Sequence, residues 1–377
     1  MKQRIIQFCH RIIFADAISN HLLELWRVFA DSGYDSIISA YHIGKNLREK
    51  DFVIPIEKLK VNFDDILIYH NCGIYDYAFI LGKFSCKKIF LFHNETPEIF
   101  LNDYKKSIIS SSDKSIAKIH PHFLQKTIIN GIKARHNVKK MASIFPISWT
   151  VSHYNASCLR KAGFNTIEVL PIPFKRSKNK IKPTFSIIKK YSDTKNIIFV
   201  GRIVSNKKQM DIIKAFAYYN KLMPDSCLFL IGEFAFSQSY KEEFLQYAKS
   251  LGLINCVFMP GKISYEDLEA YWCSASLFLS MSEHEGFCVP ILEAFAHEIP
   301  VLAYASSAVT ETVGNAGLLF YEKNFPRIAE TMHSIIENHE YAEKLKTAGL
   351  EQIKKYDPDI LSKTAVELLE KCIKEYP

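Results

Sequence analysis

Several features are missing from this sequence, and each absence excludes a class of protein. The nine cysteines form no CxxC pair, so the sequence predicts neither a zinc knuckle nor a disulfide framework and favours a reducing compartment. No apolar run approaches the roughly 18 residues that a membrane span needs, and no basic, apolar leader opens the chain. With 48% hydrophobic and 23% charged residues, disordered and fibrous classes are also excluded. We expect a cytoplasmic protein, soluble or attached only peripherally to a membrane.

The net charge of +8 is concentrated in two basic segments. Residues 104–140 carry nine Lys or Arg against one acid, and residues 175–195 carry eight against one. For residues 104–140 two interpretations stay open: attraction to an anionic surface such as acidic lipid headgroups, and a solvated helix face. For residues 175–195 the composition favours an unstructured linker. Neither segment carries a nucleic-acid-binding motif, so nucleic acid is not an expected partner.

Short apolar runs alternate with helical patterns along the chain, which is typical of parallel βαβ units. The rhythm stops at the second basic segment and begins again at the apolar run 197–200, whereas the chain beyond about residue 325 has helical patterns only. The sequence therefore predicts two parallel α/β sheets. The expected parts are an N-terminal domain over 1–174, a basic linker over 175–195, a C-terminal domain over 196–355 and a helix over 356–377 that packs back on the N-terminal domain.

The first segment that could carry chemistry follows the strand expected at 197–200. It runs through Gly201 and Arg202 to Lys207. Ligands of open α/β sheets bind at the carboxyl ends of strands, where two cations can neutralise a diphosphate. Such cations would stabilise a departing diphosphate more in the transition state than in the ground state. The alternative on these residues alone is a pair of solvated surface cations.

A second segment, residues 282–294, follows the strand expected at 277–279. Pro290 suits the first turn of a helix, so the amides of residues 286–289 would lie at a helix N-terminus, where phosphate oxygens bind. Glu285 precedes these amides and Glu293 lies one turn inside the helix. Two carboxylates at this separation can accept hydrogen bonds from different hydroxyls of a polyhydroxylated anion. Taken singly, each carboxylate is better explained as an exposed acid.

Together these segments resemble glycosyltransferase family 4, the retaining nucleotide-sugar transferases of GT-B fold. The spacing from Glu285 to Glu293 matches the E-x7-E motif of that family. Other stretches similar to family blocks are Gly201-Arg202 with Lys207, 281–287 and 316–320, and more loosely 16–20, 69–71 and 92–97. The resemblance covers most of the chain. It implies two Rossmann-like parallel-sheet domains facing a cleft, with a helical C-terminal tail.

The resemblance also implies roles for individual residues. Arg202 and Lys207 would hold the donor diphosphate. Glu285 would bind hydroxyls of the transferred sugar, and Glu293 would bind the ribose. His93 would face the sugar from across the cleft, although on the residues alone a satisfied strand-end histidine is the simpler explanation. The further donor-side candidates are Gly201, Gly286, Phe287, Cys288, Val289, Gly261 and Lys262, and the acceptor-side candidates are Asp16, Asn20 and Asn94.

The implied activity is that of a metal-independent, hexosyltransferase-type glycosyltransferase. It would move a sugar from a UDP- or GDP-linked donor to a glycan, with no cofactor. The expected acceptor is a lipid-linked intermediate of lipopolysaccharide O-antigen, capsule or exopolysaccharide synthesis, reached at the inner face of the cytoplasmic membrane through residues 104–140. Asp357-Pro358-Asp359 has the form of a metal-binding motif, but its place at the start of a helical pattern indicates a helix cap.

The sequence departs from the family pattern at two places, and two alternatives stay open. Many members have a glycine-rich loop after the first strand, whereas residues 14–17 contain no glycine, and Thr310 stands where proline is common. One alternative is a catalytically silent partner that binds a sugar nucleotide and docks a transferase. The other is a GT-B sugar-nucleotide epimerase, which the E-x7-E spacing argues against.

Overall fold

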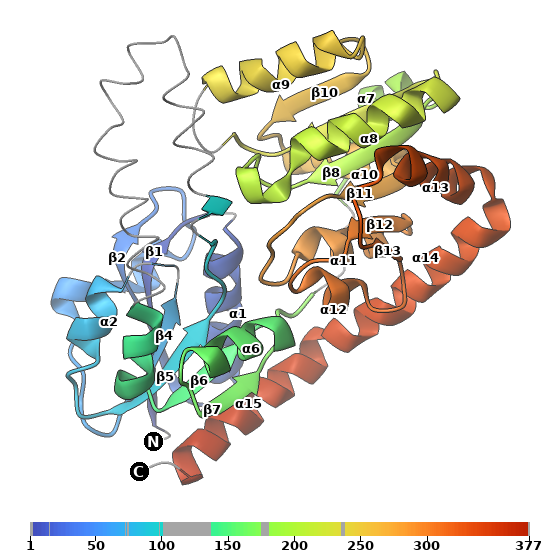
Figure 1. The fold of residues 1–377 in the computed structure, drawn as a ribbon. Coiled ribbons are helices and arrows are strands. Elements are labelled where there is room, and N and C mark those ends of the chain that lie inside the picture. Colours follow the sequence, from blue (N-terminus) through green and yellow to red (C-terminus); the bar gives the residue numbers. More distant parts are fainter. Residues whose placement is uncertain are drawn as a thin grey trace. The chain divides into compact units, whose positions relative to one another are not determined.

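The chain forms two compact α/β units. The computed structural model describes residues 3–375 apart from Ala15, Cys72, Ile74, Glu98, 101–136, 175–180 and 235–237. Unit 1 comprises Met1–Glu95, Lys126–Pro173 and Tyr356–Pro377, and unit 2 comprises Thr96–Gln125 and Phe174–Lys355. Each unit contains one parallel sheet with helices packed on it (Figure 1), so the predicted fold class is confirmed. The basic segment 104–140 lies outside the described residues up to position 136.

Unit 1 is built on a seven-stranded sheet in the order β3-β2-β1-β4-β5-β6-β7. Its strands are β1 (Arg4–Ile12), β2 (Asp35–Ile43), β3 (Val53–Pro55), β4 (Ile66–Asn71), β5 (Lys87–Phe92), β6 (Ile147–Thr150) and β7 (Thr166–Val169). Its helices include α1 (Ala17–Asp31), η1 (Lys50–Phe52), η2 (Ile56–Lys58), α2 (Asp76–Leu81), α6 (His153–Lys161) and α15 (Pro358–Glu375). Residues 137–144 are also helical.

The central strand β1 is buried on both faces, as strands of covered parallel sheets are. Phe8 packs with Tyr69 on one face, while Cys9 packs with Leu22 of α1 on the other. The helix α1 begins at Ala17. The reason is local, because the Asp16 side chain accepts a hydrogen bond from the Ser19 amide and caps the helix.

The last helix, α15, belongs to unit 1. Its start is capped by Asp357, whose carboxylate accepts from the Asp359 amide at 2.9 Å, so the expected helix cap is confirmed. The helix packs against α1, and Lys371 pairs with Glu168 of β7 at 2.7 Å. Within the described ranges, no helix combines the length and the apolar character needed to cross a bilayer.

Unit 2 is built on a six-stranded sheet in the order β10-β9-β8-β11-β12-β13. Its strands are β8 (Lys195–Val200), β9 (Ser226–Ile231), β10 (Val257–Gly261), β11 (Leu277–Ser280), β12 (Val301–Tyr304) and β13 (Leu318–Phe320). Its helices are α7 (Phe185–Lys190), η3 (Ser205–Lys207), α8 (Gln209–Leu222), α9 (Gln238–Ser250), α10 (Tyr265–Ser274), α11 (Val289–Ala296), α12 (Val309–Val313), α13 (Phe325–Glu337) and α14 (His339–Ile353), and η4 (Lys354–Tyr356) follows α14.

The segment expected to be an unstructured linker is packed structure over much of its described part. It contains α7, and the Thr184 hydroxyl before this helix donates to Asp267 of α10 at 2.6 Å. Tyr191 after the helix is buried, with its ring centroid 4.7 Å from that of Phe229. The prediction from the lysine-rich composition was therefore wrong, because a few apolar residues between the charges are enough to dock the short helix α7 on α10 and Tyr191 on the sheet.

Gly349 in α14 allows close packing of two helices. A Cβ atom placed on Gly349 would lie 2.6 Å from Cδ1 of Phe295 in α11. Phe295 is almost fully buried and has little room to move. The glycine therefore acts as a contact point that sets how closely α11 approaches α14.

We expect Gly349→Ala to destabilise unit 2 by about 1–3 kcal/mol, because the added methyl group overpacks a filled interface. The sign is informative, since the same change in an uncrowded helix stabilises by roughly 0.5–1 kcal/mol. Urea unfolding followed by circular dichroism measures the effect. Thr347→Ala, at an exposed position of the same helix, serves as the control and should shift stability by under about 0.5 kcal/mol. A more stable Gly349→Ala protein would contradict this account.

Candidate functional site

In unit 2 the order of the strands places a topological switch point between β8 and β11. Strand β8 pairs with β9 on one side and with β11 on the other, all in parallel. Because successive connections leave these two strands in opposite directions, ligands of open parallel sheets bind at such a point, outside the carboxyl ends. The segment 201–207 follows β8 and the segment 281–288 follows β11. The structure therefore brings together the two segments that the sequence singled out.

Asn206 joins these two loops directly. Its carbonyl oxygen accepts from the Glu283 amide at 2.8 Å, and its side-chain amide donates to the His284 carbonyl at 2.9 Å. The residue is buried. The sequence analysis missed Asn206, and its only sequence signal was its place between Arg202 and Lys207.

Lys207 and Glu285 form an ion pair in which Nζ of the lysine donates to Oε1 of the glutamate. Only 8% of the Glu285 side chain and 20% of the Lys207 side chain are exposed. A carboxylate in such a position needs a partner, since an unpaired buried charge costs several kcal/mol. The two residues were predicted separately, one for a diphosphate and one for sugar hydroxyls, and the structure places them in direct contact.

Hydroxyl groups after β12 hold the loop that carries Glu285. The Glu285 amide donates to Oγ of Ser307 at 2.7 Å, and the Ser306 hydroxyl donates to the Ser282 carbonyl. Thr312 of α12 donates its hydroxyl to the Phe287 carbonyl. These contacts fix the backbone on both sides of the carboxylate. The sequence analysis missed all three hydroxyl residues, although a Ser-Ser pair just after an apolar run could have suggested a capping role.

Three glycines with positive φ lie where β8, β9 and β10 end. They are Gly201, Gly232 and Gly261, with φ of 150°, 147° and 79°. The Gly232 amide donates to the Gly261 carbonyl at 3.1 Å, and a Cβ on Gly232 would lie 1.9 Å from the Gly201 carbonyl oxygen. Only glycine fits there, because the neighbouring backbone occupies the space of a side chain. Gly201 and Gly261 were predicted site residues, whereas Gly232 was not.

The N-terminus of α11 lies directly after the Glu285 loop. Cys288 caps the helix in the left-handed conformation with φ of 78°, and Pro290 occupies the first turn, as the sequence predicted. Burial, and then the charge of Glu285, raise the pKa of the Cys288 thiol well above its ordinary value. The side chains of Phe287 and Cys288 are buried, so the part of this segment that a ligand can reach is mainly backbone.

Glu293 lies inside α11 and is partly buried. Burial raises the pKa of its carboxyl group to about 7, and His297 one turn later lowers it in part. His297 is itself fixed, since its Nδ1 lies 2.7 Å from the Glu293 carbonyl oxygen and its Nε2 lies 3.1 Å from Glu269. Glu293 therefore carries a proton for part of the time at neutral pH and can both donate to and accept from a hydroxyl group.

The remaining predicted cations of unit 2, Arg202 and Lys262, follow β8 and β10 with exposed side chains. Both are therefore accessible to an anion in solution. An arginine at such a place can bind two oxygens of a phosphate at once, whereas a lysine acts as a point charge.

The predicted residues of unit 1 lie near the carboxyl ends of β1 and β5. Asp16 caps α1 and accepts from the Ser19 hydroxyl at 2.9 Å, while Asn20 is exposed on the first turn of that helix. His93 follows β5 and is buried, and Asn94 next to it is half-buried. The Asp16 carboxylate thus has a structural function that the sequence analysis did not assign, and the acceptor-side roles of these residues stay predictions.

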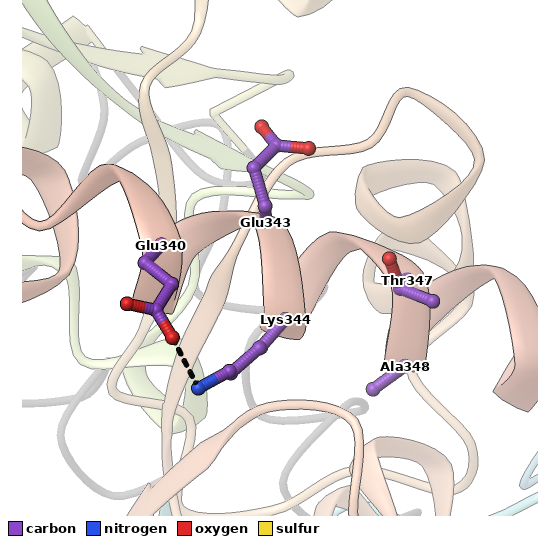
Figure 2. Close-up of a pocket in the computed structure, with 5 residues that line it drawn as sticks. All are labelled: Glu340, Glu343, Lys344, Thr347 and Ala348. Carbon is purple, nitrogen blue, oxygen red and sulfur yellow. Dashed lines mark hydrogen bonds and ion pairs between the residues drawn. The ribbon is translucent and has the colours of Figure 1, made fainter.

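A surface pocket elsewhere in unit 2 contains none of these residues. It lies along α14 and is lined by Glu340, Glu343, Lys344, Thr347 and Ala348 (Figure 2). Glu340 and Lys344 pair across one helical turn at 2.7 Å, and both are largely exposed. This pocket is a hollow beside a solvated helix face. Among the residues that the structure describes, no group of three or more His, Cys, Asp or Glu is arranged to hold a metal ion.

The architecture is that of the GT-B fold. The structure of Anabaena HepE in complex with UDP and glucose matches 98% of this chain and 100% of its own, with a TM-score of 0.73 and 16% sequence identity. At this identity the likeness concerns the fold. The fold class is thus GT-B, as predicted, with two parallel-sheet Rossmann-like units and a helical C-terminal tail.

The sequence comparisons find similarity in the segment that carries the site. Residues 181–352 match the model of the family described as glycosyl transferases group 1, and this range includes Arg202, Lys207, Glu285 and Glu293. The GDP-mannose-dependent monoacylated alpha-(1-6)-phosphatidylinositol monomannoside mannosyltransferase of Corynebacterium glutamicum is 24% identical over 245 residues, 61% of this chain and 62% of the relative. O-antigen chain mannosyltransferase B of Escherichia coli is 30% identical over 96 residues, 26% of this chain and 25% of the relative. The matches therefore span less than two thirds of the length of these relatives.

We expect Glu293→Gln to remove a pH dependence of stability from unit 2. Between pH 4.5 and about 7 the folded protein holds a proton at Glu293 that the unfolded chain has released, so wild-type stability falls as the pH rises through this range. Allowing for partial exposure, the loss at pH 8 relative to pH 4.5 is on the order of 2 kcal/mol. The variant should match wild type near pH 4.5 and exceed it by this amount at pH 8, as measured by urea unfolding.

Glu330→Gln, at an exposed position of α13, provides the matched control and should leave the wild-type pH dependence in place. If the stability of Glu293→Gln depends on pH in the same way as that of wild type, the Glu293 carboxyl group does not have a raised pKa in the folded protein.

Proposed function

We propose that this protein is a retaining glycosyltransferase of family 4 that moves a hexose from a nucleoside diphosphate sugar to a glycan acceptor. The proposed acceptor is a lipid-linked intermediate of O-antigen, capsule or exopolysaccharide synthesis. The observation that carries the proposal is the buried Lys207–Glu285 pair at the switch point of unit 2, beside the N-terminus of α11. The match of residues 181–352 to the group 1 family supports it.

The charges near this point suit a nucleoside diphosphate. Lys207 has three N–H donors, so its ammonium group can bind a phosphate oxygen and keep its contact with Glu285. Arg202 and Lys262 add exposed positive charge. The backbone amides at the start of α11 can bind an anion, as amides at helix N-termini do. This arrangement would stabilise negative charge that develops on a departing diphosphate, without requiring a metal ion.

The carboxylates suit the hydroxyl-bearing parts of such a donor. Glu285 accepts hydrogen bonds beside the diphosphate-binding cation, which is where the transferred sugar would begin. Glu293, about one turn inside α11 and partly protonated at neutral pH, can exchange hydrogen bonds with the two ribose hydroxyls. Transfer with retention would then proceed with the departing phosphate oxygen taking the proton of the incoming acceptor hydroxyl.

The names of similar proteins support the donor and acceptor classes. HepE was solved with UDP and glucose, and the Corynebacterium relative is described as GDP-mannose-dependent. The Escherichia coli relative is described as an O-antigen chain mannosyltransferase. We therefore propose a UDP- or GDP-linked donor. Cytoplasmic location and contact of residues 104–140 with an anionic membrane stay predictions, since most of that segment lies outside the described residues.

We expect Lys207→Met and Glu285→Gln each to lower sugar transfer by about 10²–10³-fold, which corresponds to ~3–4 kcal/mol of lost transition-state stabilisation. Transfer from each UDP- and GDP-hexose to a lipid-linked glycan pool is measured with radiolabelled sugar. Circular dichroism checks folding, and Glu285→Gln leaves no unpaired buried carboxylate, so it tests the role even if Lys207→Met folds poorly.

The matched controls are Lys221→Met and Glu330→Gln, which change exposed residues of α8 and α13 and should keep wild-type turnover. Wild-type rates in both site variants would refute the assignment. A folded wild-type protein that binds a sugar nucleotide and transfers nothing would instead favour the silent-partner alternative.

The donor base can be identified without an acceptor. We expect one of UDP, GDP, ADP and CMP, or its sugar conjugate, to raise the melting temperature of wild type by about 5–10 °C, because a ligand at a hundredfold its Kd adds about 2.7 kcal/mol. Glu293→Ala should lose most of this shift, since it removes the proposed ribose contact. A thermal-shift panel measures both, and equal shifts in wild type and variant would exclude a role of Glu293 in donor binding.

A further inference from the structure

Three histidines are buried together at the carboxyl edge of the unit 1 sheet. His21 comes from α1, His70 lies near the end of β4 and His93 follows β5. Their exposed fractions are 2%, 0% and 6%. The rings of His70 and His93 stack with centroids 5.4 Å apart, and the ring of His21 stands edge-on to that of His93 at 5.3 Å. The sequence analysis named only His93 among them.

A hydrogen-bonded chain links His93 to the interior of the sheet. Oε1 of Gln7, on β1, lies 3.0 Å from Nε2 of His70. Nδ1 of His70 lies 3.2 Å from Nε2 of His93. The backbone of His93 is fixed as well, because its carbonyl oxygen accepts from the Asn155 side chain at 2.8 Å. Both the position and the ring orientation of His93 are thus determined by buried groups of unit 1.

All three imidazoles are neutral at physiological pH. Burial lowers the pKa of His21 to about 4. Burial also lowers the pKa of His70 and His93 well below the ordinary value, and the titratable groups that face His93, namely His21 and His70, lower its pKa further. Burial makes a charge on any one ring unfavourable, and a second charge would be repelled by the first. The cluster therefore has no low-energy cationic state near pH 7.

The neutral rings and the orientation of the Gln7 side chain, whose oxygen Oε1 faces His70, together set the direction of the hydrogen bonds. The Gln7 amide oxygen can only accept, so His70 must carry its proton on Nε2. A neutral His70 then has a lone pair on Nδ1, which can only accept, so His93 must carry its own proton on Nε2. The Nδ1 atom of His93 is then left with a lone pair that can accept a hydrogen bond.

We propose that Gln7 and His70 are positioning residues that hold His93 in the neutral Nε2–H tautomer, so that its Nδ1 accepts a hydrogen bond from a sugar hydroxyl. The sugar part of this inference rests on the proposed function, whereas the tautomer does not. A neutral acceptor suits glycosyl transfer, because the sugar ring gains positive charge in an oxocarbenium-like transition state and a cationic imidazolium beside it would be repelled. The ring of His21 packs edge-on against the ring of His93 and limits its rotation.

The tautomer is measured by NMR on the full chain labelled with ¹⁵N in histidine, without any ligand. The resonances of His93 are assigned by their loss in His93→Gln. We expect a protonated Nε2 and an unprotonated Nδ1, with no titration between pH 8 and pH 6. A protonated Nδ1, a mixture of the two tautomers or titration in this range would overturn the proposal.

Gln7→Glu tests whether the chain sets the tautomer. When the new carboxyl group and His70 together hold one extra proton, His70 must donate from Nδ1, and His93 must then accept at Nε2 and carry its proton on Nδ1. We therefore expect the tautomer of His93 to reverse as the pH falls from 9 to 6. An unchanged tautomer in a folded Gln7→Glu protein would show that the chain does not control His93.

His70→Phe removes the link while keeping a ring in place, and it should leave His93 as a mixture of tautomers. His42→Phe, at an exposed position of β2, is the matched control and should leave the His93 spectrum unchanged. A His93 spectrum equal to wild type in His70→Phe would contradict the inference. Circular dichroism establishes that each variant is folded.

Kinetics test the contact with the sugar. We expect His70→Phe and Gln7→Glu at pH 6 to lower kcat/KM for the nucleotide sugar about tenfold, as the loss of one hydrogen bond would, with unchanged affinity for the nucleotide alone. Unchanged kcat/KM would remove the sugar contact from the proposal. If wild type transfers no sugar but shows the expected tautomer, the proposed function fails and the positioning of His93 stands.

Discussion

The ion pair between Lys207 and Glu285 is the interaction on which the site of unit 2 depends. A carboxylate that is 8% exposed is stable only when a cation and hydrogen-bond donors replace the water it has lost. Lys207 supplies the cation, and the surrounding structure holds the two residues in place in three ways. Asn206 joins the loop after β8 to the loop after β11. The hydroxyl oxygen of Ser307 accepts a hydrogen bond from the Glu285 amide. The turn at Cys288 begins α11 directly after the loop that carries Glu285. Without these contacts the two loops could move, and the charges of Lys207 and Glu285 would separate into water.

Desolvation also shifts the pKa of several titratable groups near the two sheet edges. In unit 2 it raises the pKa of Glu293 to about 7 and the pKa of the Cys288 thiol well above its ordinary value, so both groups are wholly or partly protonated near the Lys207–Glu285 pair. In unit 1 the same effect keeps His21, His70 and His93 neutral. Burial thus leaves largely neutral groups beside the ion pair in unit 2, and an uncharged hydrogen-bonded chain in unit 1.

Local features of the fold were predictable because their physical causes are local. The cap at Asp357 and the proline in the first turn of α11 involve residues within a few positions of each other. The parallel α/β class followed from the alternation of apolar runs and helical patterns. The segment expected to be a linker shows the limit of this approach. Its lysines suggested an unstructured chain, but Tyr191 packs against Phe229 and the helix α7 docks on α10, which composition does not reveal.

The sequence by itself determined which residue types meet the carboxyl ends of the strands, because the E-x7-E spacing and the residues after each apolar run are properties of a single stretch of chain. Only the tertiary structure decided which of them touch. Lys207 and Glu285 are 78 positions apart, as are Asn206 and His284, and the chain from Gln7 to His93 crosses three neighbouring strands. Contacts of this kind depend on the order of strands in the sheet and on the removal of water from between them. Neither the order of the strands nor the burial of these groups follows from the spacing of residues along the chain.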